Sequence, residues 1–241
     1  RIESSSESAS SYYSNLNNRK GYPMNSLFSV NYKGLNEKGY PVAYKADGSE
    51  ISDYDELTKE DLTYSGTYDP PYHSSFANTL SCKGFEFSFM FVYAGGHVMR
   101  DVAANYCIVY HPMYLTVNVD RNMINYWKKQ GDEKSENTNP AFMFQSAARN
   151  GEYIWKAANK HIQKGDYIKL RDVSIAYSLP SFLLKNMPLS GVKFNMQARN
   201  LWWWAANKSG LDPEVWEGDT MSPSRGIHYP AEFILGLTIN F

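Results

Sequence analysis

The chain lacks the features that mark several protein classes. Its 241 residues contain no apolar run of about 18 residues or more, which excludes a membrane-spanning helix. It has only two cysteines, Cys82 and Cys107, which form neither a disulfide framework nor a metal motif. A formal net charge of −1 leaves no basic excess, so nucleic acid is not an expected partner.

Motifs for catalysis and metal binding are also missing. The five histidines are too scattered for a zinc motif. There is no G-x-S-x-G segment, no phosphate-binding loop and no pair of carboxylates at a hydrolytic spacing. The acidic stretch from Asp47 to Asp61 does not have the spacing of an EF-hand calcium loop. We therefore expect no enzymatic activity, no bound metal and no cofactor.

What the sequence does contain is clearest in its last nine residues. Phe233, Leu235, Leu237, Ile239 and Phe241 fall on one face of an extended strand, and smaller or polar residues take most of the other face. A strand with lipid on one side and water on the other needs this alternation. The end of the chain therefore predicts a strand of an outer-membrane β-barrel. An aromatic content of 15% fits two interfacial girdles in such a barrel.

The same alternation occurs in six segments, each close to the length that crosses a bilayer when tilted. These segments are residues 25–33, 73–82, 85–95, 166–179, 191–201 and 231–241. The predicted fold class is therefore all-β, a transmembrane antiparallel barrel of which this chain supplies about the last six strands. Six strands cannot close a barrel, and an open sheet in lipid leaves unpaired backbone groups. We therefore expect the chain to be part of a larger protein.

The connections between these segments alternate in length. Short turns are expected at Lys83-Gly84 and from Pro180 to Ser190, on the periplasmic side. The long connections are expected to be extracellular loops, and they cover 34–72, 96–165 and 202–230. Residues 1–24, before the barrel portion 25–241, are expected to form a periplasmic turn or a disordered stub.

Several segments resemble the SusC/RagA family of TonB-dependent outer-membrane transporters, typical of Bacteroidetes. Residues 165–180 (GDYIKLRDVSIAYSLP) are similar to the family's GDFIRLRNVTLSYNLP segment, and residues 32–41 to its GLDENGxP segment. The pair Asn200-Leu201 followed by residues 210–214 (GLDPE) resembles the family's NL…GxDPE, and residues 229–241 resemble its final strand. The matches occur in the family's order.

The resemblance implies the C-terminal part of a 22-stranded barrel that has an N-terminal plug. It also implies a SusD-like surface lipoprotein as partner, energy from the TonB complex, and uptake of oligosaccharides or peptides. The last aromatic residue, Phe241, would belong to the signal by which such barrels are recognised for insertion. The expected location is the bacterial outer membrane, with lipid around the barrel.

Alternation gives candidate site residues. Six side chains should point into the lumen, where they either line a substrate path or pair with the plug or one another: Glu86, Ser88, Lys193, Asn195, Gln197 and Arg199. The aromatic candidates in the loops are Trp127, Trp202, Trp203 and Trp204. They form either a contact surface for substrate or the lid protein, or part of the aromatic girdle.

Two other functions remain open from the sequence. One is a TonB-dependent importer of siderophores or vitamins that works without a lipoprotein lid. The other is a secreted β-sandwich that binds carbohydrate or adheres to surfaces, which would require the face of Phe85–Tyr93 to be buried in a core.

Overall fold

In the computed structural model the chain divides into two compact units. The sheet unit comprises Pro70–Gly96, Gly165–Val215 and Gly226–Phe241. The loop unit comprises Arg1–Asp69, His97–Lys164 and Trp216–Arg225. The structure describes residues 9, 12, 19–101, 121–142, 145–215, 217–218, 223–224 and 227–241. None of the helices in these ranges is long and apolar enough to cross a membrane. Position 107, the second cysteine, lies outside them.

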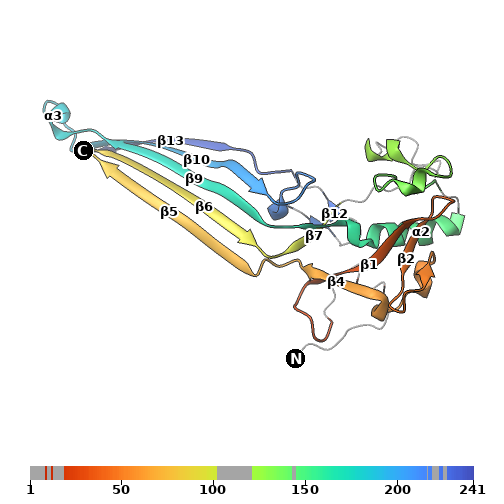
Figure 1. Cartoon of the computed structure of the whole chain (residues 1–241). Coiled ribbons are helices and arrows are strands. Elements are labelled where there is room, and N and C mark those ends of the chain that lie inside the picture. The colour runs from red at the N-terminus through yellow and green to blue at the C-terminus, as the bar shows by residue number, and fades with distance from the viewer. Residues whose placement is uncertain are drawn as a thin grey trace. The chain divides into compact units, whose positions relative to one another are not determined.

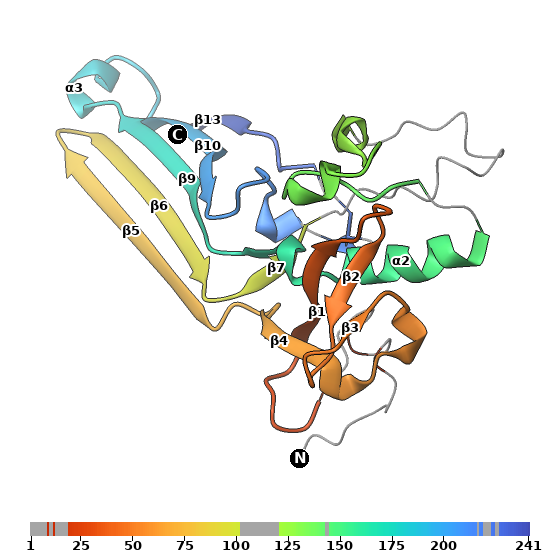
Figure 2. The ribbon, with the colours of Figure 1, turned by 45° about the vertical axis from the view of Figure 1, so that its right-hand side comes forward.

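The sheet unit is a five-stranded antiparallel sheet in the order β13-β10-β9-β6-β5 (Figures 1 and 2). Neighbouring strands of the sheet follow one another along the chain, so the sheet is a meander. Its strands are β5 (Tyr72–Cys82), β6 (Phe85–Gly95), β9 (Tyr167–Ser178), β10 (Gly191–Ala205) and β13 (Glu232–Asn240).

The connections within this sheet alternate between short and long. Lys83 and Gly84 join β5 to β6, and both have positive φ, 46° and 86°, as a tight hairpin turn requires. The connection from β9 to β10 contains the short helix α3 (Ser181–Leu184), at the same end of the sheet as the C-terminus (Figure 1). The long connections, from β6 to β9 and from β10 to β13, leave from the opposite end, where Ala94 pairs with Tyr167.

The loop unit has its own small sheet, in the order β3-β2-β1-β4. Its core contains Phe28, Val30, Ala43, Leu62 and Ile154, all buried. The elements of this unit are β1 (Ser26–Leu35), β2 (Pro41–Tyr44), β3 (Glu50–Ile51), η1 (Tyr54–Glu56), η2 (Lys59–Asp61), β4 (Leu62–Thr67), β7 (Val98–Arg100), η5 (Arg121–Asn125), η6 (Asp132–Lys134), α2 (Gln145–Ala157), η7 (Asn159–His161), β8 (Ile162–Lys164), β11 (Glu217–Gly218) and β12 (Pro223–Ser224).

A buried arginine fixes three segments of this unit together. The guanidinium of Arg100 donates hydrogen bonds to the carbonyl oxygens of Phe28 (2.7 Å) and Lys156 (3.0 Å). Burial lowers the pKa of Arg100 to about 10, and it lowers the pKa of the neighbouring His161 to about 3. The regions expected as long loops at 34–72 and 96–165 thus contain strands, helices and a core of their own.

The structure corrects the assignment of residues 25–33 to the long sheet. A strand does form there, as β1, but it pairs with β2 and β4. Residues 26–30 are all buried, on both faces of the strand. The alternation of Phe28, Val30 and Tyr32 is therefore satisfied by a protein core, and a lipid-facing strand would give the same sequence pattern.

The structure also corrects part of the expectation for residues 1–24. Ala9 and Tyr12 are buried, and the ring of Tyr12 lies edge-on to Phe28 at 5.8 Å between centroids. Arg19 donates a hydrogen bond to the carbonyl of Lys59 at 2.7 Å. These residues belong to the folded loop unit. Residues 1–8, 10–11 and 13–18 lie outside the described part of the chain.

Candidate functional site: the polar face of the sheet

The register of the long strands separates apolar from polar side chains. Phe194 lies opposite Tyr177 on one side and Leu237 on the other, whereas Lys193 lies opposite Ser178 and Thr238. We call the side of the sheet that carries Phe194 the apolar face and the side that carries Lys193 the polar face. Because side chains alternate along a strand, this register keeps the two sets apart from the turn end of the sheet as far as Asp172, where the register shifts.

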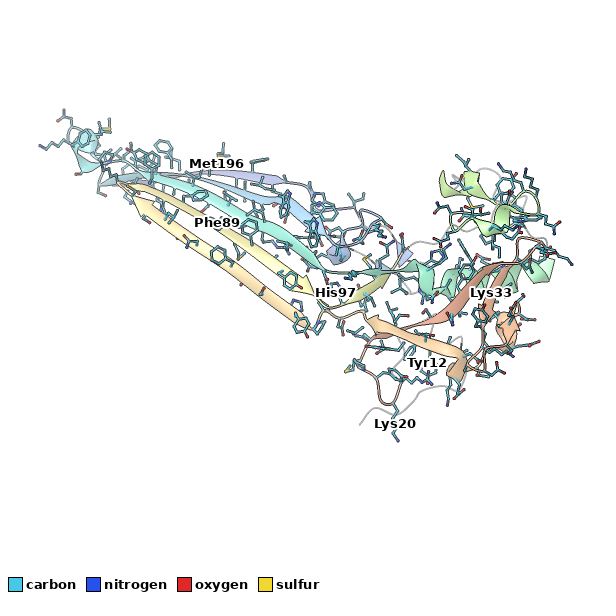
Figure 3. All side chains as sticks on the ribbon, viewed as in Figure 1. Tyr12, Lys20, Lys33, Phe89, His97 and Met196 are labelled. Carbon is cyan, nitrogen blue, oxygen red and sulfur yellow. The ribbon has the colours of Figure 1, made fainter. Side chains whose placement is uncertain are left out.

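The apolar face is exposed in the sheet unit. Leu235 is 79% exposed and Phe233 is 63% exposed, and large apolar side chains on all five strands are likewise accessible (Figure 3). Soluble monomers rarely expose a contiguous apolar surface of this kind, and such a surface marks a contact with lipid or with another protein. Exposed members along the strands include Phe76, Leu80, Phe85, Ile175, Phe194, Met196, Phe233, Leu235 and Leu237.

The polar face brings together the six predicted lumen residues. Lys193 and Glu86 form an ion pair at 3.6 Å on two strands that are not neighbours, since β9 lies between them. The Ser88 hydroxyl lies 2.7 Å from that of Ser174. Asn195 packs over Gly236, where an added β-carbon would lie 2.5 Å from the amide oxygen of Asn195. These contacts pair the candidate residues with one another or with neighbouring strands.

Asp172 is the centre of a second group of polar side chains on this face. It was not among the site residues expected from the sequence. It accepts a hydrogen bond from Gln197 and lies 3.7 Å from the guanidinium of Arg199. A groove of about 670 Å³ runs over this region of the sheet. Its polar lining includes Ser88, Arg171, Asp172, Gln197, Arg199 and Tyr229. The groove thus presents donors, acceptors and both signs of charge.

A β-bulge shifts the alternation in this region. Between the pairs Arg199–Asp172 and Trp202–Leu170, β10 has two residues where β9 has one. Asn200 adopts φ = 54°, the left-handed conformation that asparagine tolerates better than most residues. β9 in turn has one extra residue, Arg171, relative to β6. The alternation of β9 therefore shifts by one residue beyond this point, whereas β10 keeps its even positions on the apolar face.

The three consecutive tryptophans therefore divide between the faces. Trp202 pairs with Leu170 and Trp204 with Ile168, and both indoles are about half exposed. Trp203 lies on the polar side, where its ring is 5.6 Å from that of His228. The fourth candidate, Trp127, belongs to the loop unit, where its indole N–H donates to Glu133 at 3.1 Å.

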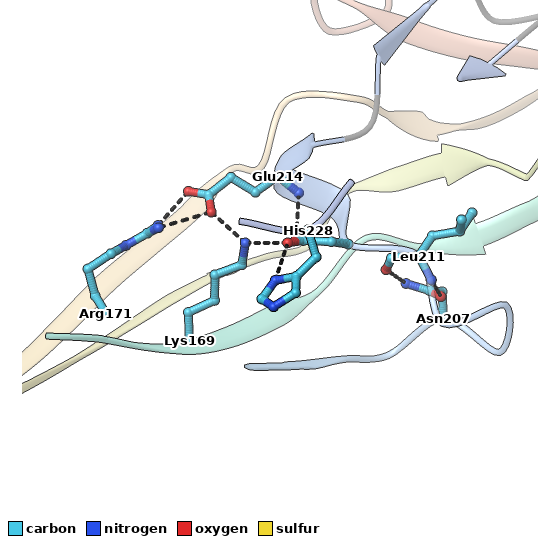
Figure 4. A network of polar contacts seen from close by, with 7 residues as sticks. Lys169, Arg171, Asn207, Leu211, Glu214 and His228 are labelled. Carbon is cyan, nitrogen blue, oxygen red and sulfur yellow. Dashed lines mark hydrogen bonds and ion pairs between the residues drawn. The ribbon is translucent and has the colours of Figure 1, made fainter. Parts of the chain in front are cut away.

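A buried ion network lies beyond the bulge, at the end of the sheet with the long connections (Figure 4). Nζ of Lys169 donates to Oδ2 of Asp212 (2.7 Å) and to Oε2 of Glu214 (2.5 Å). Arg171 forms a bidentate pair with Glu214. The side chains of Lys169 and Asp212 are only 6% and 1% exposed. The network ties the loop after β10, including η8 (Pro213–Val215), to strand β9.

The network changes the titration of Glu214, which lies in the loop. Burial alone raises the pKa of this carboxyl group, but the hydrogen bonds from Arg171 and Lys169 outweigh burial and hold the pKa below its ordinary value. His228 lies on the other side of the network, with Nδ1 3.8 Å from Oδ2 of Asp212. Within the loop, Asn207 exchanges two hydrogen bonds with Leu211 at 2.6 and 2.9 Å.

One signal in the sequence could have revealed this network. Lys169 and Arg171 alternate with apolar residues on a strand, so both cations are directed to the same side. Two cations on one side of a strand need carboxylate partners where they are buried. Asp212 and Glu214 in the next long loop are two positions apart, as Lys169 and Arg171 are. No group of three or more metal-binding side chains occurs in the described ranges.

The end of the chain lies at the edge strand of the sheet. β13 pairs with β10 from Glu232 to Asn240, and the side chain of Phe241 beyond it is 89% exposed. Phe241 is an even number of positions from Leu235 and Ile239, so it continues their row of alternate residues. Its carbonyl accepts a hydrogen bond from the Ser190 hydroxyl at 3.3 Å. The geometry leaves the terminal aromatic ring accessible.

Comparisons with known proteins agree with this architecture. No protein-family model matches the chain, and no curated protein matches it. Solved structures of a peptide importer do match it. A chain in "Structure of the RagAB peptide importer in the 'open-open' state" gives a TM-score of 0.66 at 21% identity. This chain has the fold of part of an importer chain.

Two further structures give the same result. The "Structure of the RagAB peptide transporter" matches with a TM-score of 0.65 at 21% identity, and the importer in the "closed-closed" state with 0.65 at 20%. In all three cases the match covers 92% of this chain but 23% of the other chain. This chain therefore spans about a quarter of the length of the importer chains that it resembles, and the likeness shows the fold alone.

Proposed function

We propose that this chain forms the C-terminal part of the wall of an outer-membrane importer. The observation that carries the proposal is the five-stranded meander with an exposed apolar face and a hydrogen-bonded, charged polar face. In a transmembrane barrel the apolar face contacts lipid and the polar face lines the lumen. The short turns then lie in the periplasm, and the long connections lie outside the cell.

The open edges of the sheet require further strands. In the described residues, β5 and β13 each pair on one side only. Each backbone N–H or C=O group left without a hydrogen bond in lipid costs roughly several kcal/mol. We infer that strands from the rest of a larger barrel cover both edges. The likeness to a segment of much longer importer chains supports this inference.

The proposed activity is nutrient uptake together with a SusD-like surface lipoprotein, energised by TonB. The similar structures carry the description of a peptide importer, which favours peptides over oligosaccharides as the cargo. Glu86 with Lys193, and Asp172 with Arg199, give the polar face paired charges of both signs. Such a surface can hydrogen-bond a peptide chain without a strong preference for one net charge. We propose a transport role and no catalytic one.

The sandwich alternative is not favoured by the exposure of the apolar face. That reading needs the side chains of Phe85–Tyr93 to be buried under a second sheet. Phe85 is 56% exposed and Phe87 is 37% exposed. The loop unit has its core around Phe28 and Ile154, elsewhere in the chain.

Purification of the full-length protein from its native outer membrane tests the proposal. Mass spectrometry of the detergent-solubilised complex should find one surface lipoprotein at a ratio of about one to one, and an unrelated tagged barrel from the same membrane serves as control. A barrel that is recovered alone would instead support an importer of siderophores or vitamins without a lid. Recovery of the protein as a folded monomer in the soluble fraction would contradict the membrane assignment.

A further inference from the structure

The connection from β9 to β10 exposes more apolar surface than a turn in water should. Phe182 is 69% exposed, and Leu183 and Met187 are each more than half exposed. Leu184, on the same helical turn, is buried at 6%. The connection therefore has its own buried residue and still presents three large apolar side chains outward, which marks an interaction surface.

This apolar cluster is held in place by backbone hydrogen bonds. The N–H of Leu183 donates to Pro180 at 3.0 Å, and that of Met187 donates to Leu184 at 2.9 Å. Both ends are tied to the sheet, because Leu179 donates to Val192 at 2.9 Å and Ser190 donates to Asn240 at 2.8 Å. The exposed side chains thus project from an ordered turn whose distance from the strand ends is fixed.

The two short turns at this end of the sheet carry lysines and no acidic side chain. The connection from Leu179 to Ser190 contains Lys185 and no acidic residue. The other short turn at the same end contributes Lys83, which is also exposed. Apolar side chains beside exposed lysines fit the boundary between acyl chains and anionic phosphate headgroups. At the same end, the rings of Phe85 and Tyr177 lie 4.2 Å apart between their centroids.

We propose that the turn from Leu179 to Ser190 is a lipid anchor in the periplasmic leaflet of the outer membrane. Phe182, Leu183 and Met187 insert at the boundary between headgroups and acyl chains, and Lys185 lies at the level of the phosphates. The inference rests on the proposed function, because only a membrane-embedded sheet brings this turn to a lipid surface. The anchor fixes the depth of β9 and β10 in the bilayer.

Fluorescence quenching in the full-length protein tests this inference. A variant without reactive cysteines receives one cysteine, at position 182, 187, 186 or 235, and an environment-sensitive NBD label. The protein is reconstituted into vesicles of phosphatidylethanolamine and phosphatidylglycerol. Quenchers are lipids with bromine near the headgroup or deep in the acyl chain, and iodide in the aqueous phase. Asn186 is the matched control, because it is an exposed polar residue in the same turn.

The inference predicts that the probes at 182 and 187 lose fluorescence with the shallow lipid quencher and resist iodide, whereas the probe at 186 responds to iodide. Quenching at 182 by iodide alone would overturn it, because the turn would then lie in water. Protection at 182 from both quenchers would also overturn it, because a protein would then cover the turn. The probe at 235 separates the two proposals. If it is not quenched by the deep lipid quencher, the assignment of the apolar face fails, and the anchor fails with it.

The role of Lys185 is tested by changing the charge of the lipid. Replacing phosphatidylglycerol by phosphatidylcholine should reduce lipid quenching at position 182, and Lys185→Glu should abolish this dependence on the anionic lipid. Asn186→Ser should leave the dependence unchanged. Equal dependence in the Lys185→Glu protein and in its parent would remove Lys185 from the anchor.

Discussion

Lys169 and Asp212 are 43 positions apart in the sequence, and their side chains form an ion pair of 2.7 Å that is almost fully shielded from solvent. The pair joins a long strand to the loop that follows the next strand. A buried charge that loses its partner is costly, since it keeps the desolvation penalty without the compensating attraction. The attachment of this loop therefore depends on both residues being present.

The first prediction concerns this attachment. Asp212→Asn should loosen the loop after β10 at a cost of up to about 3–5 kcal/mol, because the buried Lys169 would keep only Glu214 of its two carboxylate partners. Limited proteolysis of the full-length protein in detergent should show faster cleavage within 206–231. As a control, Glu86→Gln removes the carboxylate that pairs with Lys193 in an exposed ion pair, and it should leave that cleavage rate unchanged. Equal cleavage in the Asp212→Asn protein and its parent would show that the network does not hold the loop.

The second prediction is a pH dependence that arises from Glu214. Its folded pKa is lowered, so its contribution to loop attachment is fully present above its ordinary pKa of 4.5 and is lost as the pH falls through the folded pKa. A spin label at position 208 should become more mobile as the pH falls below that ordinary value. In Glu214→Gln the label should be mobile at neutral pH and show less change on acidification. An acid response of the same size in that variant would assign the effect to another group.

The third prediction compares the two faces on one strand. Phe89→Arg places a charge on the apolar face and should cost about 2–4 kcal/mol if the residue lies near the bilayer midplane. Ser88→Arg, one residue away, places the same charge on the polar face and should allow assembly. The yield of heat-modifiable barrel on a gel measures assembly of the full-length protein. Equal losses for the two variants would be incompatible with the assigned faces.

The fourth prediction concerns the last residue. Phe241 is exposed at the end of the edge strand, where an insertion machinery could reach its ring. Deletion of Phe241 should sharply lower the amount of full-length protein at the cell surface, whereas Phe241→Trp should retain it. Surface labelling of intact cells provides the measurement. Unchanged display of the truncated protein would remove Phe241 from the insertion signal.

Part of this fold follows from the sequence because side-chain alternation is a direct consequence of strand geometry. The register of β9, β10 and β13 places Tyr177, Phe194 and Leu237 in one row, as the alternation of apolar and polar residues in each strand predicts. Lumen candidates such as Glu86 and Lys193 could be assigned to one face for the same reason. The separation needs no knowledge of long-range contacts.

Other parts of the fold could not be predicted, because the alternation of side chains does not show whether lipid or protein covers a strand. Phe28 and Val30 alternate like a lipid-facing strand, yet they are buried in the core of the loop unit. The bulges near Arg171 and Asn200 also shift the alternation of β9, in a way that only its pairing with β6 and β10 reveals. Asp172 was missed because its importance arises from Gln197 and Arg199 on another strand. Such contacts depend on register.

Labelling of single cysteines along β13 is the decisive test of whether this sheet is the wall of a membrane barrel. Single cysteines at each position from 233 to 241 of the full-length protein, in outer-membrane vesicles, are exposed to a lipid-soluble and to a small water-soluble thiol reagent. In a barrel wall, odd positions should react with the lipid-soluble reagent and even positions with the water-soluble one. Reaction of both sets with the water-soluble reagent, without alternation, would contradict it.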